Sequence, residues 1–237
     1  PSKVAMAGKI QPNGSYLKGI EDFIPSSQYN CDKHHLKVVE DIKENWVTLS
    51  LNSKFHALLA TESIPEAIAY YRLLRKEMPT LKVTALFDPN IDNTGGQTFK
   101  EEGLIEVLEG YKEQFGKTYT MSTHAAFKQD VALRLAHKKP YNGKDFTKDK
   151  QINLLIVVNQ MLTGFDSKWI NTLYVDKVME YENIIQAFSR TNRLFGPDKP
   201  FGVIRYYRYP NTMKRNIDKA VAMYSDNKPL KLFADPL

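Results

Sequence analysis

The sequence predicts an α/β protein in which a parallel β-sheet is flanked by helices. Short apolar runs, which suit buried strands, alternate along the chain with segments whose apolar residues recur every three or four positions, as in helices. The run 154–158 is five consecutive apolar residues, as expected of a central parallel strand covered on both faces. Strands separated by helices imply right-handed crossovers between parallel neighbours.

The first part of the chain leads into this pattern. Residues 1–30 contain Gly, Pro, Ser and Asn without clear periodicity, which indicates an extended lead-in. A helix is predicted from Asp32 to Trp46, because apolar residues within it fall at spacings of three and four. The apolar run 55–60 is the first predicted strand of the sheet.

The remaining elements alternate between helix and strand. Ser63 is a favourable N-cap, and Pro65 suits the first turn of a helix. The segment 88–150 is long for a link between two strands, so we expect it to hold two extra helices. Further strands are predicted at 82–87, 152–158, 172–175 and 202–207, and further helices at 99–115, 123–137, 181–194 and 211–223.

Composition excludes some classes of protein. No apolar run approaches the ~20 residues that a membrane-spanning helix needs. Cys31 is the single cysteine, so the chain holds no internal disulfide or zinc-type cysteine cluster, and we expect a reduced, cytoplasmic setting. The formal net charge is +6, and the part from Lys177 onward carries 11 Lys/Arg against 6 Asp/Glu. That basic end suits nucleic acid or nucleotide phosphates, or simply a solvated surface.

One segment imitates a phosphate-binding loop. Gly116, Lys117 and Thr118 resemble the end of a P-loop, but the upstream Gly110 is separated from Gly116 by five residues instead of four. The preceding segment also has the pattern of a polar helix, whereas a P-loop follows a buried strand. We therefore interpret this segment as the end of a surface helix.

Two other segments carry candidate chemistry. The strand 152–158 leads into a turn that contains Thr163, Gly164 and Asp166. Gly164 allows the backbone to turn tightly and approach a ligand, while the other two supply a hydroxyl and a carboxylate. Taken alone, the same residues are equally consistent with a plain strand-to-helix turn in which Asp166 is an N-cap.

The second segment is the predicted helix 181–194. Helical spacing places Gln186, Arg190 and Arg193 on one stripe, at positions i, i+4 and i+7. An arginine fork binds phosphate oxygens bidentately, and in phosphoryl transfer an arginine finger neutralises charge that develops in the transition state. A solvated basic helix face is the alternative for this stripe considered alone.

Taken together and in this order, the segments resemble motifs V and VI of superfamily 2 helicases and translocases. The segments 162–166, 172–177 and 186–193 are similar to the motor (R) subunit of type I restriction–modification enzymes, and 57–71 is similar to its motif IV region. The resemblance covers about 55–208. It implies the second RecA-like domain of a motor, with a parallel sheet of the P-loop NTPase type.

The resemblance implies a role for each motif residue. Two arginines would be catalytic and reach the γ-phosphate of ATP: Arg190 and Arg193. Three residues would contact the nucleotide: Gly164, Asp166 and Gln186. Three would contact the DNA backbone: Thr61, Ser63 and Thr163. For Thr61 and Ser63, a plain helix cap is equally consistent with the sequence.

The resemblance also implies what this stretch of sequence lacks. A complete motor has a first RecA-like domain that binds most of ATP and Mg²⁺, and the family's subunit has a nuclease domain; neither has a counterpart here. We expect residues 1–50 to be a lead-in and helix, 51–210 the second motor domain, and 211–237 a helix and tail that lead to a further helical region. The implied partners are double-stranded DNA and the methylation and specificity subunits.

Two alternatives stay open from sequence. The chain could be the second domain of another superfamily 2 DNA helicase, or a non-catalytic nucleic-acid-binding module with a helicase-like fold. A small-molecule phosphate enzyme anchored by Lys117 is a further alternative, which a position of Lys117 far from the carboxyl ends of the strands would exclude.

Overall fold

Five parallel strands form the central sheet of the computed structural model, which describes residues 5–90, 95–143, 146–158, 167–191 and 193–224. Neighbouring strands pair in parallel throughout. Their order across the sheet is β4 (Val83–Leu86), β5 (Leu154–Val158), β3 (His56–Thr61), β6 (Ile170–Asp176) and β7 (Val203–Tyr206). The predicted fold class, an α/β protein with a parallel sheet flanked by helices, is confirmed.

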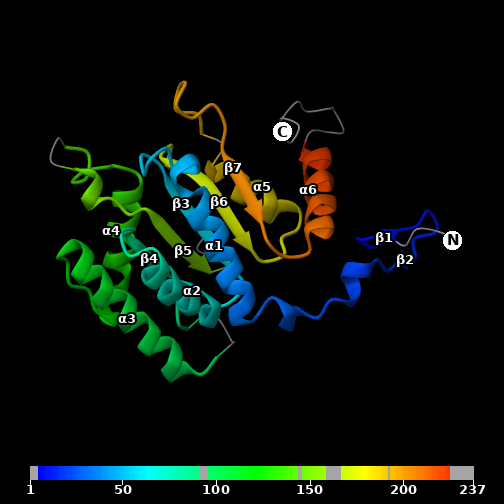
Figure 1. The fold of residues 1–237 in the computed structure, drawn as a ribbon, viewed down its shortest axis with the longest axis horizontal. Coiled ribbons are helices and arrows are strands. Elements are labelled where there is room, and N and C mark those ends of the chain that lie inside the picture. Colours follow the sequence, from blue (N-terminus) through cyan, green and yellow to red (C-terminus); the bar gives the residue numbers. More distant parts are fainter. Residues whose placement is uncertain (1–4, 91–94, 144–145, 159–166, 192, 225–237) are drawn as a thin grey trace.

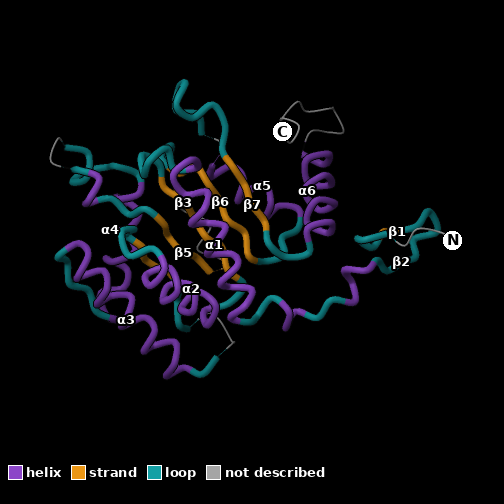
Figure 2. The backbone as a smooth tube through the Cα atoms, in the orientation of Figure 1, coloured by secondary structure: helices purple, strands orange, loops and turns teal. Residues whose placement is uncertain are grey.

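Helices cover both faces of this sheet (Figures 1 and 2). In Figure 1, α1 and α2 lie in front of the strands and α5 lies behind them. The third helix packs beside α2, beyond β4. The helices are α1 (Asp32–Leu49), α2 (Ile64–Glu77), α3 (Gln97–Phe115), α4 (His124–Leu135), α5 (Tyr181–Thr191) and α6 (Pro210–Tyr224).

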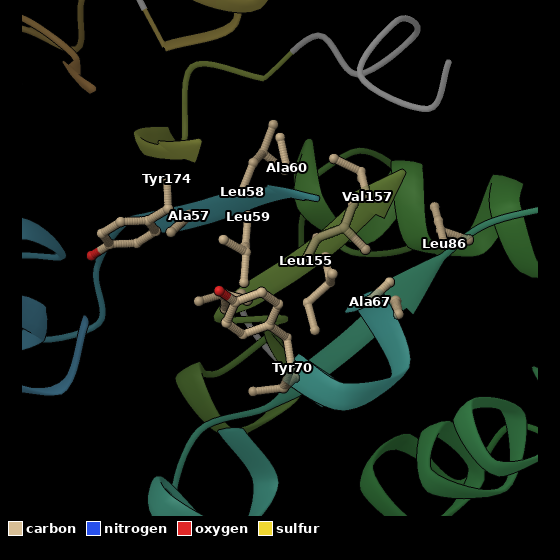
Figure 3. Packing of buried hydrophobic residues seen from close by; sticks show 14 of the residues in the cluster. Ala57, Leu58, Leu59, Ala60, Ala67, Tyr70, Leu86, Leu155, Val157 and Tyr174 are labelled. Atoms are coloured by element: carbon tan, nitrogen blue, oxygen red, sulfur yellow. The ribbon is translucent and has the colours of Figure 1, made fainter. Parts of the chain in front are cut away.

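The core lies between the central strand and the helices. The apolar residues of β3 and β5 are buried, because side chains on both faces of these strands meet a helical layer. Figure 3 shows the alternation along β3: Leu58 and Ala60 point to one face, and Leu59 points to the face that carries Tyr70 of α2. Burying these side chains on both faces is what fixes the strand in the middle of the sheet.

The structure differs from the sequence prediction in the lead-in, at the start of β6 and at the end of α5. The lead-in is not wholly irregular, because β1 (Lys9–Ile10) and β2 (Tyr16–Leu17) form a small antiparallel pair. Strand β6 begins two residues earlier than predicted, at Ile170. Helix α5 ends at Thr191, three residues before the predicted end at 194. The two helices predicted within 88–150 are α3 and α4.

Short 3₁₀ turns complete the described elements. They occur at Ile20–Phe23, Ser26–Gln28, Met121–Thr123 and Lys148–Lys150. The first of these is tied to the far end of the chain, because the Glu21 carboxylate accepts hydrogen bonds from the backbone N–H groups of Asn211 and Thr212, at 2.9 and 2.7 Å. An acidic side chain in this position satisfies the first N–H groups of α6.

Candidate functional site at two ends of the sheet

The carboxyl ends of three central strands meet at one edge of the sheet. Thr61, the last residue of β3, lies opposite Val158 at the end of β5 and opposite Asp176 at the end of β6. The loops that follow these strands therefore leave from neighbouring points, as predicted for the ligand side of a parallel α/β sheet. Two predicted DNA-contacting residues, Thr61 and Ser63, lie at this edge.

The two residues have different surroundings. Thr61 is fully buried, and its hydroxyl faces the backbone carbonyls of Ser63 at 3.3 Å and Val157 at 3.4 Å. It shapes the turn from inside. Ser63 is the N-cap of α2: its hydroxyl accepts from the Glu66 N–H at 3.4 Å, and the Glu66 carboxylate accepts from the Ser63 N–H at 3.1 Å. The predicted cap is confirmed as a capping box.

A buried ionic network lies directly beneath this cap. Arg208 donates to the Glu66 carboxylate at 2.6 Å and to both oxygens of Asp176 at 3.0 Å. Tyr70 and His34 also contact Asp176, at 2.6 and 2.7 Å. The network joins α1, α2, β6 and the segment after β7. The capping box of α2 is thus part of a rigid hydrogen-bonded unit.

Electrostatics inside this network favour the charged forms. Burial alone would raise the pKa of Asp176, but hydrogen bonds from His34 and Arg208 outweigh it and lower the pKa to about 2. Burial likewise works against the Arg208 guanidinium, yet the two carboxylates raise its pKa above the ordinary arginine value. Both groups therefore stay ionised at neutral pH.

The sequence interpretation missed this network. The only signal was an acidic residue, Asp176, that directly follows the apolar residues of a predicted strand. Its partners His34, Glu66 and Arg208 come from distant parts of the chain, separated from it by 142, 110 and 32 residues. Pairings of that kind depend on the strand order, which one sequence does not reveal.

Gln186 and Arg193, two of the predicted nucleotide-site residues, lie elsewhere. They are on or just after α5, which covers the face of the sheet opposite α2. Gln186 is exposed on α5, on the wall of a groove of about 350 Å³ between α5 and α6. The groove is otherwise lined by Tyr181, Glu182, Ile185, Ala220, Met223 and Tyr224.

Arg193 lies beyond the end of α5, so the predicted helical stripe of three residues is wrong in its last member. Because α5 ends at Thr191, Gln186 and Arg190 are on the helix and Arg193 is in the loop that follows it. The Arg193 carbonyl accepts a hydrogen bond from Lys199, which also donates to the carbonyl of Ile170, the first residue of β6. Arg193 therefore lies at the amino edge of the sheet, and it is exposed.

Thr61 and Ser63 are thus separated from Arg193 by the length of the sheet. A strand rises about 3.3 Å per residue, so the seven residues of β6 span on the order of 20 Å. Among the described residues, Thr61 and Ser63 therefore do not share a pocket with Arg193. Thr163, Gly164 and Asp166, and the side chain of Arg190, lie outside the described residues.

The segment 116–118, which resembles a P-loop in sequence, lies at the C-terminal end of α3. Gly116 is the C-cap of this helix, with a left-handed φ of 69°. Gln114, in the last turn, contacts Val83 at the start of β4, so this helix end lies at the amino edge of the sheet. Lys117 pairs with Asp130 of α4 at 2.6 Å. Lys117 is therefore far from the carboxyl ends of the strands, which excludes the phosphate enzyme anchored by this lysine.

The described ranges lack both a metal-binding cluster and a membrane-spanning helix. Those residues contain no group of three or more His, Cys, Asp or Glu side chains placed to hold a metal ion. Nor does any helix there have the length and apolar character to cross a membrane.

Comparison with known proteins points in one direction. Residues 53–209 match the family described as type I restriction enzyme subunit R, domain 3. A type I restriction enzyme endonuclease subunit of Staphylococcus aureus strain MRSA252 is 35% identical over 203 residues, which are 82% of this chain and 21% of the relative. A corresponding subunit of Staphylococcus saprophyticus is 35% identical over 201 residues, or 81% of this chain and 20% of the relative.

A solved structure was also found. The C-terminal part of the Fun30 ATPase domain matches with a TM-score of 0.41 and 11% identity, over 86% of this chain and 51% of that one. Among the sequence relatives, the chain spans about a fifth of the length of the staphylococcal subunits.

Proposed function

Because the chain belongs to the R-subunit family of type I restriction enzymes, we propose that it forms the second motor domain of an ATP-dependent double-stranded DNA translocase. In this proposal it supplies the arginine side of an ATP site and contacts to the DNA backbone. The full-length protein would be a type I site-specific deoxyribonuclease that works with methylation and specificity subunits.

The ATP part of the proposal is supported by the position of Arg193. It is exposed at one edge of the sheet, where another domain could present a nucleotide to it. A guanidinium in this position would bind phosphate oxygens and neutralise charge that develops during phosphoryl transfer. Arg190, Gln186, Gly164 and Asp166 would complete the nucleotide contacts of this side.

The first motor domain would bind most of the ATP and the Mg²⁺ ion. The described residues of this chain fit the arginine half of such a site. They contain no cluster of three or more His, Cys, Asp or Glu side chains that could hold the metal ion. The ion would polarise the phosphate oxygens once bound. What this chain contributes is a fixed positive charge that reaches across the cleft between the domains.

The DNA part of the proposal places the backbone near the start of α2 and the Thr163 loop. The N-terminus of a helix carries partial positive charge and attracts phosphate. Ser63 lies at that point, while the buried Thr61 would hold the turn in shape instead of touching DNA. Such contacts position a protein on DNA without reading its sequence.

The sharpest test of this function replaces Arg193 in the full-length subunit. We expect Arg193→Ala to reduce DNA-stimulated ATP hydrolysis and translocation by about 10³-fold, the lower range for loss of an arginine finger. Arg72→Ala is the matched control, because Arg72 is an exposed arginine that pairs with Glu106 on the far surface of α2 and α3. Wild-type ATPase activity in the Arg193 variant, with the fold intact, would contradict the proposed role.

A further inference from the structure

The loop after α5 is anchored to the sheet by one buried lysine. Lys199 is 1% exposed, and its ammonium group donates three hydrogen bonds to backbone carbonyls. The acceptors are Arg193 and Ile170, each at 2.7 Å, and Lys168 at 3.2 Å. An ammonium has three N–H donors, so this geometry uses all of them.

The same loop is held at two further points. The Phe195 ring packs against Trp169 and Phe55, with centroids 4.6 and 5.7 Å apart. Asp198 forms an ion pair with Lys54, just before β3. The loop also closes on itself, because the Phe195 N–H donates to the Lys199 carbonyl at 3.0 Å.

The Lys199 hydrogen bond reaches Arg193 beyond the helix. Helix α5 spans Tyr181–Thr191, and Arg193 lies in the segment that follows it. Lys199 links the Arg193 carbonyl to the first residue of β6, a strand that pairs with neighbours on both sides. These two hydrogen bonds hold the backbone of the exposed Arg193 in a fixed position relative to the sheet.

We infer that Lys199 is a positioning residue for Arg193 and that it acts by fixing the Arg193 backbone to the amino end of β6. This inference rests on the proposed function of Arg193. Catalytic groups lose much of their effect when they are displaced by about 1 Å, so a positioning residue matters even without touching the substrate. Burial lowers the pKa of Lys199 to about 8, which agrees with an ammonium enclosed by protein.

The test uses the full-length subunit with its DNA and ATP. Lys199→Met keeps a side chain of similar length but removes all three donors. We expect kcat for DNA-stimulated ATP hydrolysis to fall at least tenfold, while the half-saturating concentrations of ATP and DNA change by less than about twofold. An interaction that acts only in the transition state lowers kcat without weakening substrate binding.

The matched control is Gln114→Met. Gln114 also donates side-chain hydrogen bonds to backbone carbonyls, those of Val83 at 3.0 Å and Gly110 at 2.8 Å, but it lies on α3. This variant should lose stability and keep kcat. If both variants lower kcat to the same extent, Lys199 has only a structural role and the inference is wrong.

A double-mutant cycle separates this inference from the proposed function. Arg193→Lys retains a charge and therefore a measurable rate. Combined with Lys199→Met, it should show much less than the sum of the two single effects, because residues that act as a unit are not additive. Additive losses would overturn the inference while leaving the role of Arg193 intact; no effect of Arg193→Lys or Arg193→Ala would overturn the proposed function itself.

A milder variant keeps the test informative if Lys199→Met does not fold. Lys199→Gln retains an amide with two N–H donors and removes the charge from the interior. Its kcat should lie between the wild-type and Arg193→Lys values, with unchanged half-saturating ATP. Wild-type kcat in a folded Lys199→Gln protein that has lost the Arg193 anchor, seen as faster amide exchange in the loop 193–199, would contradict the inference.

Discussion

His56 and His137 meet in the interior, with their Nε2 atoms 2.7 Å apart. Burial, with a smaller contribution from the neighbouring His137 ring, lowers the pKa of His56 to about 3. Burial, with a smaller contribution from the charge of Lys168, lowers the pKa of His137 to about 4. Both rings are therefore neutral at physiological pH. In such a pair one Nε2 carries the proton and donates it, while the other Nε2 accepts, so the two rings are in different tautomers.

The pH dependence of stability follows from these shifts. A histidine with a depressed pKa in the folded state binds its proton more readily when unfolded, where the pKa is about 6.5. The contribution of the pair is therefore present above about pH 6.5 and lost as pH falls toward 4. Chemical denaturation of the 237-residue chain should show a falling free energy of unfolding over this window. A His56→Leu variant should show a flatter profile, and an unchanged slope would contradict the assignment.

Individual side chains also mark the limit of what one sequence reveals. The N-cap role of Ser63 was predictable, because capping depends on residues within one turn. The network of Asp176 and Arg208 was not, since its members meet only once the sheet has formed. The anchoring role of Lys199 was equally hidden, as its three acceptors are backbone carbonyls, which every residue possesses.

At the scale of elements, the order of helices and strands was largely predictable. Apolar periodicity and end signals such as Gly116 are local, and they predicted each strand of the five-stranded sheet and each α-helix that the structure describes, but not the short 3₁₀ helices. The end of α5 was misplaced, because the helical pattern continues past Thr191 although the chain turns toward the sheet. Ser63 follows the carboxyl end of β3, whereas Arg193 follows α5 and lies beside the first residue of β6. Their positions at opposite edges of the sheet depend on the folded path of the chain, which the sequence pattern does not show.

Gly110 lies where α3 packs against α2. At this position the helix propensity favours alanine, whereas contacts with α2 favour glycine. A Cβ atom added to Gly110 would lie 2.0 Å from the Tyr71 hydroxyl and 2.4 Å from Arg75. Alanine is favoured over glycine within a helix by about 1 kcal/mol, yet the clash opposes it. Because the helix preference offsets part of an overpacking cost of about 1–3 kcal/mol, we expect Gly110→Ala to lower the free energy of unfolding by up to about 2 kcal/mol.

The control for this test is a neighbouring exposed position. Glu109→Ala on the same helix should change stability by less than about 0.5 kcal/mol. Urea denaturation of both variants measures the difference. A stabilised Gly110→Ala protein would mean that Tyr71 and Arg75 move aside without cost, and that the two helices are less tightly packed than described.

For the whole molecule, the decisive fact is that the chain is a fraction of its relatives' length. It spans about a fifth of the staphylococcal subunits. In the proposed function its candidate residues form only one side of an ATP site. We therefore expect the 237-residue chain alone to show no appreciable ATPase activity. Robust turnover by this chain, measured by phosphate release with and without DNA, would contradict an incomplete motor.

Binding of DNA by the same chain provides the companion measurement. Backbone contacts release counterions, so affinity should be weak and fall steeply as salt rises from about 50 to 200 mM. Fluorescence anisotropy with duplexes of unrelated sequence should give similar values. Tight binding that resists salt and prefers one sequence would instead indicate a recognition module.

The sheet also has a mechanical consequence. Its five strands form one hydrogen-bonded plate, with the start of α2 near one end and the Lys199 anchor at the other. If such a plate rotates as a rigid body about a point midway between its two ends, the DNA end moves opposite to the ATP end and by a similar distance. The stroke at the DNA end would then match the closure at the ATP end without amplification. In the proposed motor, long travel must then come from many short strokes.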